Sequence, residues 1–274
     1  VDAKVGYATR IYRQSPASRA GRLSWIMMFM LPDAPHQSRG GLISPLDDEH
    51  WIVMLIGLNG DYPPIDEAGF MQFAKSLPDS ALFDAIQQAE PMGKPFGYRN
   101  AANRLRKFEA LPRYLEGVVA LGDSVYALNP VYGQGMTVAA LAAELLDACL
   151  QNPAPLFERN FQRRLAKLLA DPWQMATGQD RLWPVAAEAY QPKLPERIMQ
   201  WYMNRLLAAM VDNGKVAEAF VNVQNMTASP LSMMHPSLMW QVLRHTRQHG
   251  RDNAENKPSA AEKGVAALSR PHSG

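Results

Sequence analysis

Apolar and polar residues alternate along much of the N-terminal part of the chain, as expected for β-strands. Residues 3–14 show this period of two, and residues 22–31 form a nearly continuous apolar run. Two further apolar runs, at 41–46 and 50–57, flank the turn-forming triplet Asp47-Asp48-Glu49. The spacing and the turn residues predict a β-hairpin. The N-terminal part is therefore predicted to form a β-sheet.

The period then changes to that of an amphipathic helix. Residues 66–77 and 80–90 each place apolar side chains on one helical face, and Asp66 is a suitable N-cap for the first helix. Residues 96–108 are predicted to form an extended, arginine-rich strand. The all-apolar run 117–121 indicates a buried strand inside a covered sheet. Such a strand needs neighbours, which we expect to lie N-terminal to the first residue.

The remainder of the chain has a helical pattern. Residues 135–150 are rich in Ala and Leu, and residues 155–249 are mostly helical in period, interrupted by prolines. Residues 250–274 are polar and small, which predicts a disordered tail. Strands followed by a strand–turn–helix and a helical end indicate an α/β (α+β) fold.

Composition narrows the class of protein. The chain has 274 residues, 47% of them hydrophobic and 20% charged, as in globular proteins. The single cysteine, Cys149, permits no intrachain disulfide, and a buried structural thiol in a reducing, cytoplasmic setting is the expectation. No apolar run reaches the roughly 18 residues of a membrane span. The apolar stretch 231–243 allows only a weak peripheral association with a membrane.

The net charge and the histidine spacing do not indicate binding of nucleic acids or metals. The net charge is +2, and the basic cluster at 99–113 carries no nucleic-acid-binding motif, so a solvated strand face or contacts near a cofactor are favoured. His245 and His249 are four residues apart without a third candidate ligand, so no metal site is predicted. No residue stands out as a catalytic acid or base.

The chemistry concentrates in Val118–Asp123 and the segment after it. Gly122 permits a sharp turn at the end of the predicted strand, where ligands of open α/β sheets collect. The carboxylate of Asp123 can accept hydrogen bonds from ribose or ribityl hydroxyls, although a turn cap is the plainer role for a Gly-Asp pair alone. The remaining segment favours the sugar-binding role.

That segment is Asn129-Pro-Val-Tyr-Gly-Gln-Gly-Met136. Pro130 presents a rigid surface against which a flat ring could lie. The turn from Gly133 through Gln134 to Gly135 opens a helix, whose N–H groups and dipole favour negative charge at Met136 and Thr137. A packed loop followed by a core helix is the alternative.

Together these residues resemble the second FAD-binding motif of single-component flavoprotein monooxygenases, the aromatic-hydroxylase and epoxidase class. In that family the Asp contacts the ribityl chain of FAD, the Pro and its loop line the isoalloxazine ring, and the helix start contacts the pyrimidine edge. Many members have a His where this chain has Tyr126. By resemblance, the cofactor-binding residues are Gly122, Asp123, Pro130, Gly133, Gln134, Gly135, Met136 and Thr137.

The family's dinucleotide fingerprint Gly-x-Gly-x-x-Gly is absent from this sequence. The resemblance therefore implies the C-terminal portion of such an enzyme, present as a truncated chain. It implies a mixed-sheet substrate domain at 1–115, the end of the FAD-binding domain at 116–152, a helical region at 153–249 and the tail at 250–274. The substrate is expected to lie over the sheet formed by residues 22–57.

The resemblance also implies an activity. NAD(P)H would reduce the FAD, and one oxygen atom of O2 would pass through a C4a-peroxyflavin to an apolar small molecule, by hydroxylation or epoxidation. A flavin-dependent reductase acting on isoprenoid double bonds, which has a related fold, is an alternative. A non-catalytic fragment that binds a hydrophobic ligand or a partner chain is another.

Overall fold

The computed structural model describes residues 1–14, 27–47, 49–99, 101–187, 193–255 and 265–267. The chain divides into two compact units. The first, here called the sheet unit, comprises residues 2–101, 182–189 and 257–274. The second, here called the helical unit, comprises residue 1 and residues 102–181 and 190–256. The predicted segments 116–152 and 153–249 thus fall almost entirely within one unit.

The sheet unit contains an antiparallel sheet in the strand order β5-β1-β4-β3-β2-β8. All described pairings in this sheet are antiparallel, where the resemblance implied a mixed sheet. The predicted hairpin is present, with Ile43 opposite Val53. The strands are β1 (Gly6–Arg13), β2 (Met28–Met30), β3 (Arg39–Pro45), β4 (His50–Gly57), β5 (Glu90–Tyr98) and β8 (Val265–Ala267).

Local hydrogen bonds explain the predicted hairpin and first helix. In the hairpin turn, Asp47 Oδ1 accepts from the backbone N–H groups of Glu49 at 2.9 Å and His50 at 2.7 Å. At the start of α2 (Glu67–Lys75), Asp66 Oδ1 accepts from the Gly69 N–H at 2.8 Å, which is the predicted N-cap. Short polar side chains thus fix the hairpin turn and the start of α2.

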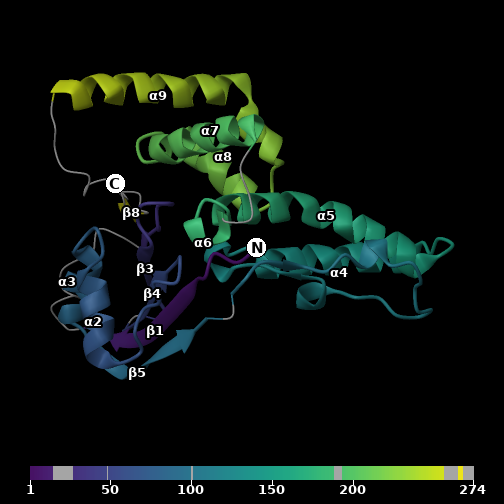
Figure 1. Ribbon diagram of the computed structural model, residues 1–274, viewed down its shortest axis with the longest axis horizontal. Coiled ribbons are helices and arrows are strands. Elements are labelled where there is room, and N and C mark those ends of the chain that lie inside the picture. Colours follow the sequence, from purple (N-terminus) through teal and green to yellow (C-terminus); the bar gives the residue numbers. More distant parts are fainter. Residues whose placement is uncertain (15–26, 48, 100, 188–192, 256–264, 268–274) are drawn as a thin grey trace. The chain divides into compact units, whose positions relative to one another are not determined.

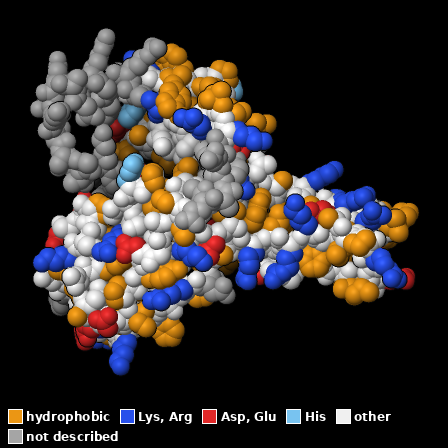
Figure 2. Space-filling view, in the orientation of Figure 1, with side chains coloured by type: hydrophobic (Ala, Val, Ile, Leu, Met, Phe, Trp, Pro, Cys, Tyr) orange, Lys and Arg blue, Asp and Glu red, His pale blue; other side chains and the backbone are white. Residues whose placement is uncertain are grey.

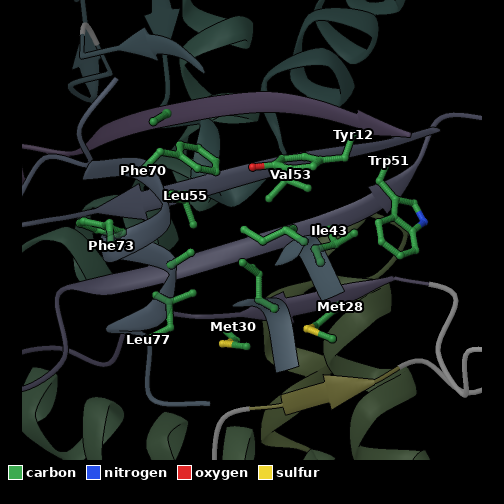
Figure 3. Packing of buried hydrophobic residues seen from close by; sticks show 14 residues of the cluster. Tyr12, Met28, Met30, Ile43, Trp51, Val53, Leu55, Phe70, Phe73 and Leu77 are labelled. Carbon is green, nitrogen blue, oxygen red and sulfur yellow. The ribbon is translucent and has the colours of Figure 1, made fainter. Parts of the chain in front are cut away.

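Helices α2 and α3 (Ala81–Gln87) cover one face of the sheet (Figure 1). The alternation along each strand sends every second side chain toward these helices. In Figure 3, Phe70, Phe73 and Leu77 meet the side chains of this sheet face. The sheet residues labelled there are Tyr12, Met28, Met30, Ile43, Trp51, Val53 and Leu55. This covered face is the core of the sheet unit.

The helical unit is built on α4 (Gly135–Gln151), which packs against α5 (Phe157–Asp180). A second cluster joins α7 (Leu194–Met210), α8 (Gly214–Gln224) and α9 (Pro236–Glu255). Cys149 is buried in α4, as predicted. A short ladder pairs β6 (Arg104–Leu105) with β7 (Tyr126–Ala127). The short helix α6 (Pro184–Ala187) belongs to the sheet unit.

The buried strand predicted at 117–121 is wrong for the described structure. These residues pair with no described strand, and Val118 is 58% exposed. Side chains bind their backbone instead: Glu158 accepts from the Gly117 N–H at 2.7 Å, and Gln162 donates to the Ala120 carbonyl at 2.8 Å. A strand exists only where another strand completes its hydrogen bonds, so an apolar run alone is insufficient.

Two other predictions are partly met. The strand expected over 96–108 is split: β5 ends at Tyr98, and the next strand, β6, holds only Arg104 and Leu105. In the predicted tail, α9 continues to Glu255 and β8 pairs with β2. The rest of the tail and residues 15–26 lie outside the described residues. None of the helices described has both the length and the apolarity needed to cross a bilayer.

Candidate functional site

The motif residues gather around the N-terminal end of α4, within the helical unit. Two short 3-10 turns, η2 (Gly122–Ser124) and η3 (Pro130–Tyr132), precede the helix. A small hollow has Gly122, Asp123 and Gly135 at its rim and apolar side chains of α4 and α5 in its wall. The fold therefore brings together the Gly-Asp turn and the glycine turn, which the sequence separates by a dozen residues.

The Gly-Asp turn is held from both sides. Gly122 has φ of +59°, a left-handed conformation that favours glycine. The Ser124 hydroxyl donates to the Leu121 carbonyl at 2.6 Å. Arg106 donates to the carbonyls of Ser124 at 3.0 Å and Asp123 at 3.4 Å. The Asp123 side chain is exposed, so its carboxylate is accessible to a hydroxylated ligand.

The Asn-Pro segment forms a rigid loop. Asn129 is fully buried and extended, with φ of −55° and ψ of 121°, as its place before proline requires. Its side-chain oxygen accepts from the Val131 N–H at 3.2 Å. Pro130 is exposed. The turn closes at Gly133, whose φ is +67° and whose N–H donates to the Pro130 carbonyl at 3.0 Å.

The helix start is open. The first helical bond runs from the Val138 N–H to the Gln134 carbonyl at 3.0 Å. The N–H groups of Gly135, Met136 and Thr137 therefore have no acceptor within the helix. Met136 is 87% exposed, so its side chain takes no part in the core. The end of the helix that carries partial positive charge thus faces accessible space.

Each of the three motif glycines faces open space. A Cβ atom built on Gly122, Gly133 or Gly135 meets no heavy atom within 4 Å. Their lack of a side chain is therefore not required by packing within the described structure. It leaves room for a group that approaches the backbone closely.

Gln134 differs from its motif neighbours because its side chain turns inward. It is 3% exposed, and its Nε2 donates to the Gln224 carbonyl at 3.3 Å. Its Oε1 is buried and has no partner among the described groups. Any contact that Gln134 makes with a ligand on the open side would thus involve its backbone.

Tyr126 contributes a second unpartnered buried atom. Its ring lines the hollow and packs edge-on against Trp173, with ring centroids 6.0 Å apart. No described group bonds to its hydroxyl, and burial raises the pKa of the phenol. The hydroxyl is therefore a neutral donor at neutral pH. An unpaired buried polar group is costly, and the hollow that Tyr126 lines has a volume of about 10 Å³, close to that needed by one water molecule.

Three polar residues that hold this site are not predicted from the sequence. Asn103 and Asp180 contact the Asn-Pro loop, and Gln224 contacts the glycine turn. All three lie outside the motif, the last by about ninety residues. Their types and local spacing carry no signal, because only the tertiary fold places them beside the loop.

The basic residues at 99–113 are divided between the two units. Arg106 donates to carbonyl groups of the Gly-Asp turn. Arg99, in the sheet unit, lies over the Tyr62 ring, 4.7 Å from its centroid. On the face shown in Figure 2, Lys and Arg side chains alternate with hydrophobic and acidic ones. Among the described residues, no group of three or more His, Cys, Asp or Glu side chains could hold a metal ion.

Similarity to known proteins is found in a curated sequence and in solved structures. No family model matches it. Protein Rv3254 of Mycobacterium tuberculosis is 29% identical over 152 residues, which cover 55% of this chain and 31% of that protein. The chain thus spans about a third of the length of this curated relative.

Solved structures also match, at low identity. PqsL of Pseudomonas aeruginosa, named as a probable FAD-dependent monooxygenase, matches 65% of this chain and 46% of its own, with 14% identity and a TM-score of 0.41. The flavin-dependent brominase Bmp2 matches 91% of this chain and 56% of its own, with 11% identity and a TM-score of 0.45. The chain spans about half the length of these structures.

Proposed function

We propose that the helical unit binds the flavin end of FAD and that the chain is part of an FAD-dependent oxidoreductase. The observation that carries this proposal is the open glycine turn at the exposed start of α4. Gly133 and Gly135 leave space at the backbone, and the N–H groups that follow have no helical acceptor. A planar, electron-rich ring edge is the kind of group that such a turn accommodates.

Each neighbouring residue has a role in this proposal. Asp123 accepts hydrogen bonds from ribityl hydroxyls, and its exposed carboxylate supports that role. Pro130 lies against the ring, and Gly133 through Thr137 offer N–H groups to its pyrimidine edge. The helix dipole stabilises negative charge there by about 0.3–2 kcal/mol. The orphan hydroxyl of Tyr126 belongs to a side chain that lines the hollow beside the Gly-Asp turn.

The whole protein, on this proposal, is a monooxygenase. When bound, FAD reduced by NAD(P)H would supply the two electrons with which one atom of O2 enters an apolar small molecule and the other leaves as water. The residues of this chain position the ring, favour its reduced form through the start of α4 and keep water from the buried wall. No acid or base is assigned.

The second face of the sheet is the proposed place for the apolar substrate. Its side chains point away from α2 and α3 and stay partly or fully exposed. Phe29 pairs with Leu42, and Leu42 with Met54, so these three form one continuous apolar strip. Ile11, which is 40% exposed, continues the strip through its pairing with Ile52. An exposed apolar strip of this kind is typical of a ligand or interaction surface.

A flavin titration with a matched pair of variants tests the proposal. The full natural polypeptide that contains residues 1–274 is titrated with FAD, and quenching of flavin fluorescence is followed. Asp123→Asn weakens binding about 5- to 20-fold, because hydrogen bonds to a charged acceptor are worth roughly 1.5–3 kcal/mol and an amide retains part of them. Asp171→Asn, an equally exposed change on α5, leaves binding unchanged.

Two outcomes count against this function. Absence of FAD binding by the unmodified protein refutes flavin binding. An equal loss of FAD affinity in Asp123→Asn and Asp171→Asn refutes the role of Asp123. Oxygen consumption with NADPH and a panel of apolar substrates then separates a monooxygenase from an isoprenoid reductase, which consumes no O2 in its reaction.

A further inference from the structure

A buried carboxylate holds the loop that carries Pro130. Asp180, the last residue of α5, is completely buried. One of its oxygens accepts from the Asn103 side-chain amide at 2.5 Å, and the other accepts from the Tyr132 hydroxyl at 2.5 Å. The carboxylate therefore bridges the segment before β6 and the end of the η3 turn.

Asn129 completes the same network. Its side-chain amide lies 3.4 Å from the second Asp180 oxygen, and its backbone N–H donates to Asn103 Oδ1 at 2.7 Å. Asn129, directly before Pro130, and Tyr132, two residues after it, are thus both tied to this network. Both ends of the short turn are fixed while Pro130 itself stays exposed.

The second half of the loop is held by the end of α8. Gln224 Nε2 donates to the Tyr132 carbonyl at 2.7 Å, and the Gln224 carbonyl accepts from Gln134 Nε2 at 3.3 Å. The residue between these two contacts is Gly133, with its left-handed backbone. The ends of two helices therefore fix the residues on either side of the exposed Pro130 and Gly133.

Stability alone is a poor explanation for this arrangement. Burial of a carboxylate has a desolvation penalty of several kcal/mol, which hydrogen bonds offset only when their geometry is good. Apolar residues of similar volume often serve stability as well or better. The hydrogen bonds of this polar network are directional, so each of them specifies where a loop atom lies.

We propose that Asp180 and Gln224 are positioning residues that pre-organise the loop from Asn129 to Gln134 for a planar ring ligand. Asp180 sets Pro130 through Asn129 and Tyr132, and Gln224 sets Gly133 through Tyr132 and Gln134. The ring-binding part of this inference rests on the proposed flavin function. A pre-organised loop raises affinity because its ordering cost is met before the ligand arrives.

The test compares two chemically identical changes. Tyr132→Phe removes the hydrogen bond to Asp180. Tyr202→Phe removes a bond of the same length, 2.5 Å, from a buried hydroxyl to the Met233 carbonyl in the second cluster of the helical unit. Amide hydrogen exchange of residues 129–136 is measured without ligand, and FAD affinity is measured in the same preparations.

Tyr132→Phe is expected to speed exchange in residues 129–136 about 5- to 10-fold and to weaken FAD binding by a similar factor, as loss of one buried hydrogen bond predicts. Tyr202→Phe leaves the exchange rates and the FAD affinity unchanged, even if it lowers the melting temperature as much as Tyr132→Phe does. Asp180→Asn keeps one acceptor oxygen. Its exchange rates and its FAD affinity are therefore expected to lie between those of the unmodified protein and those of Tyr132→Phe.

The outcomes separate the two proposals. If Tyr132→Phe leaves loop exchange at the level of the unmodified protein, or if Tyr202→Phe changes it as much, positioning by Asp180 is overturned. If the loop loosens in Tyr132→Phe only, but the unmodified protein binds no FAD, positioning stands and the flavin function fails.

Discussion

Two strand glycines of the sheet unit, Gly41 and Gly57, and the glycines of the motif loop occupy opposite environments. In the sheet unit, a Cβ atom on Gly57 would lie 1.8 Å from the Asp61 carbonyl oxygen, and one on Gly41 would lie 2.6 Å from the Leu82 side chain. At Gly57 the close atom is backbone, so no larger residue fits, whereas at Gly41 the Leu82 side chain would have to shift.

The motif glycines have no such neighbours. Gly122, Gly133 and Gly135 face open space, and two of them also have a left-handed backbone. The comparison teaches that glycine serves packing at Gly41 and Gly57 and access in the motif loop. A substitution should therefore damage folding at Gly57 but ligand binding at the start of α4.

The largest effect is expected at Gly57. Gly57→Ala forces the β4 end away from Asp61 and destabilises the protein by about 3 kcal/mol, at the upper end for overpacking. Thermal unfolding followed by circular dichroism measures it. Gly214→Ala, where the added Cβ meets nothing within 4 Å, is the control and keeps its melting temperature. Equal melting of the two variants would show that the close packing around Gly57 is unimportant.

A smaller effect on stability is expected at Gly133. Gly133→Ala and Gly93→Ala both place a side chain at positive φ, +67° and +79°, in open space. Each loses roughly 1 kcal/mol of stability through backbone strain. Only Gly133→Ala is expected to lose FAD affinity, by about 10-fold or more, because its methyl group enters the proposed ring site. Equal affinity in both would place the ligand elsewhere.

Local chemistry made part of this fold predictable. The hairpin turn and the Asp66 cap depend on hydrogen bonds between residues two or three positions apart, so short sequence windows contain the whole cause. The start of α4 at Gly135 was equally local, since a left-handed glycine and an open helix end follow from the glycine turn itself.

Features that depend on distant partners were not predictable. The apolar run at 117–121 predicts a buried strand, but whether a strand forms depends on another strand beside it. Asp180 and Gln224 carry no signal in the sequence, because a carboxylate or amide at a helix end is ordinary until the fold sets it against a loop. The inward turn of the Gln134 side chain has the same origin.

The most direct test of the central claim compares Gly135→Ala with Gly178→Ala. Both positions are helical, and at both an added Cβ meets nothing within 4 Å, so each change keeps or slightly raises stability through the better helix propensity of alanine. Isothermal titration with FAD is carried out on the full natural polypeptide. The account predicts at least a 10-fold weaker Kd, about 1.4 kcal/mol, for Gly135→Ala alone. Unchanged FAD affinity in Gly135→Ala would contradict the claim that the start of α4 receives the flavin.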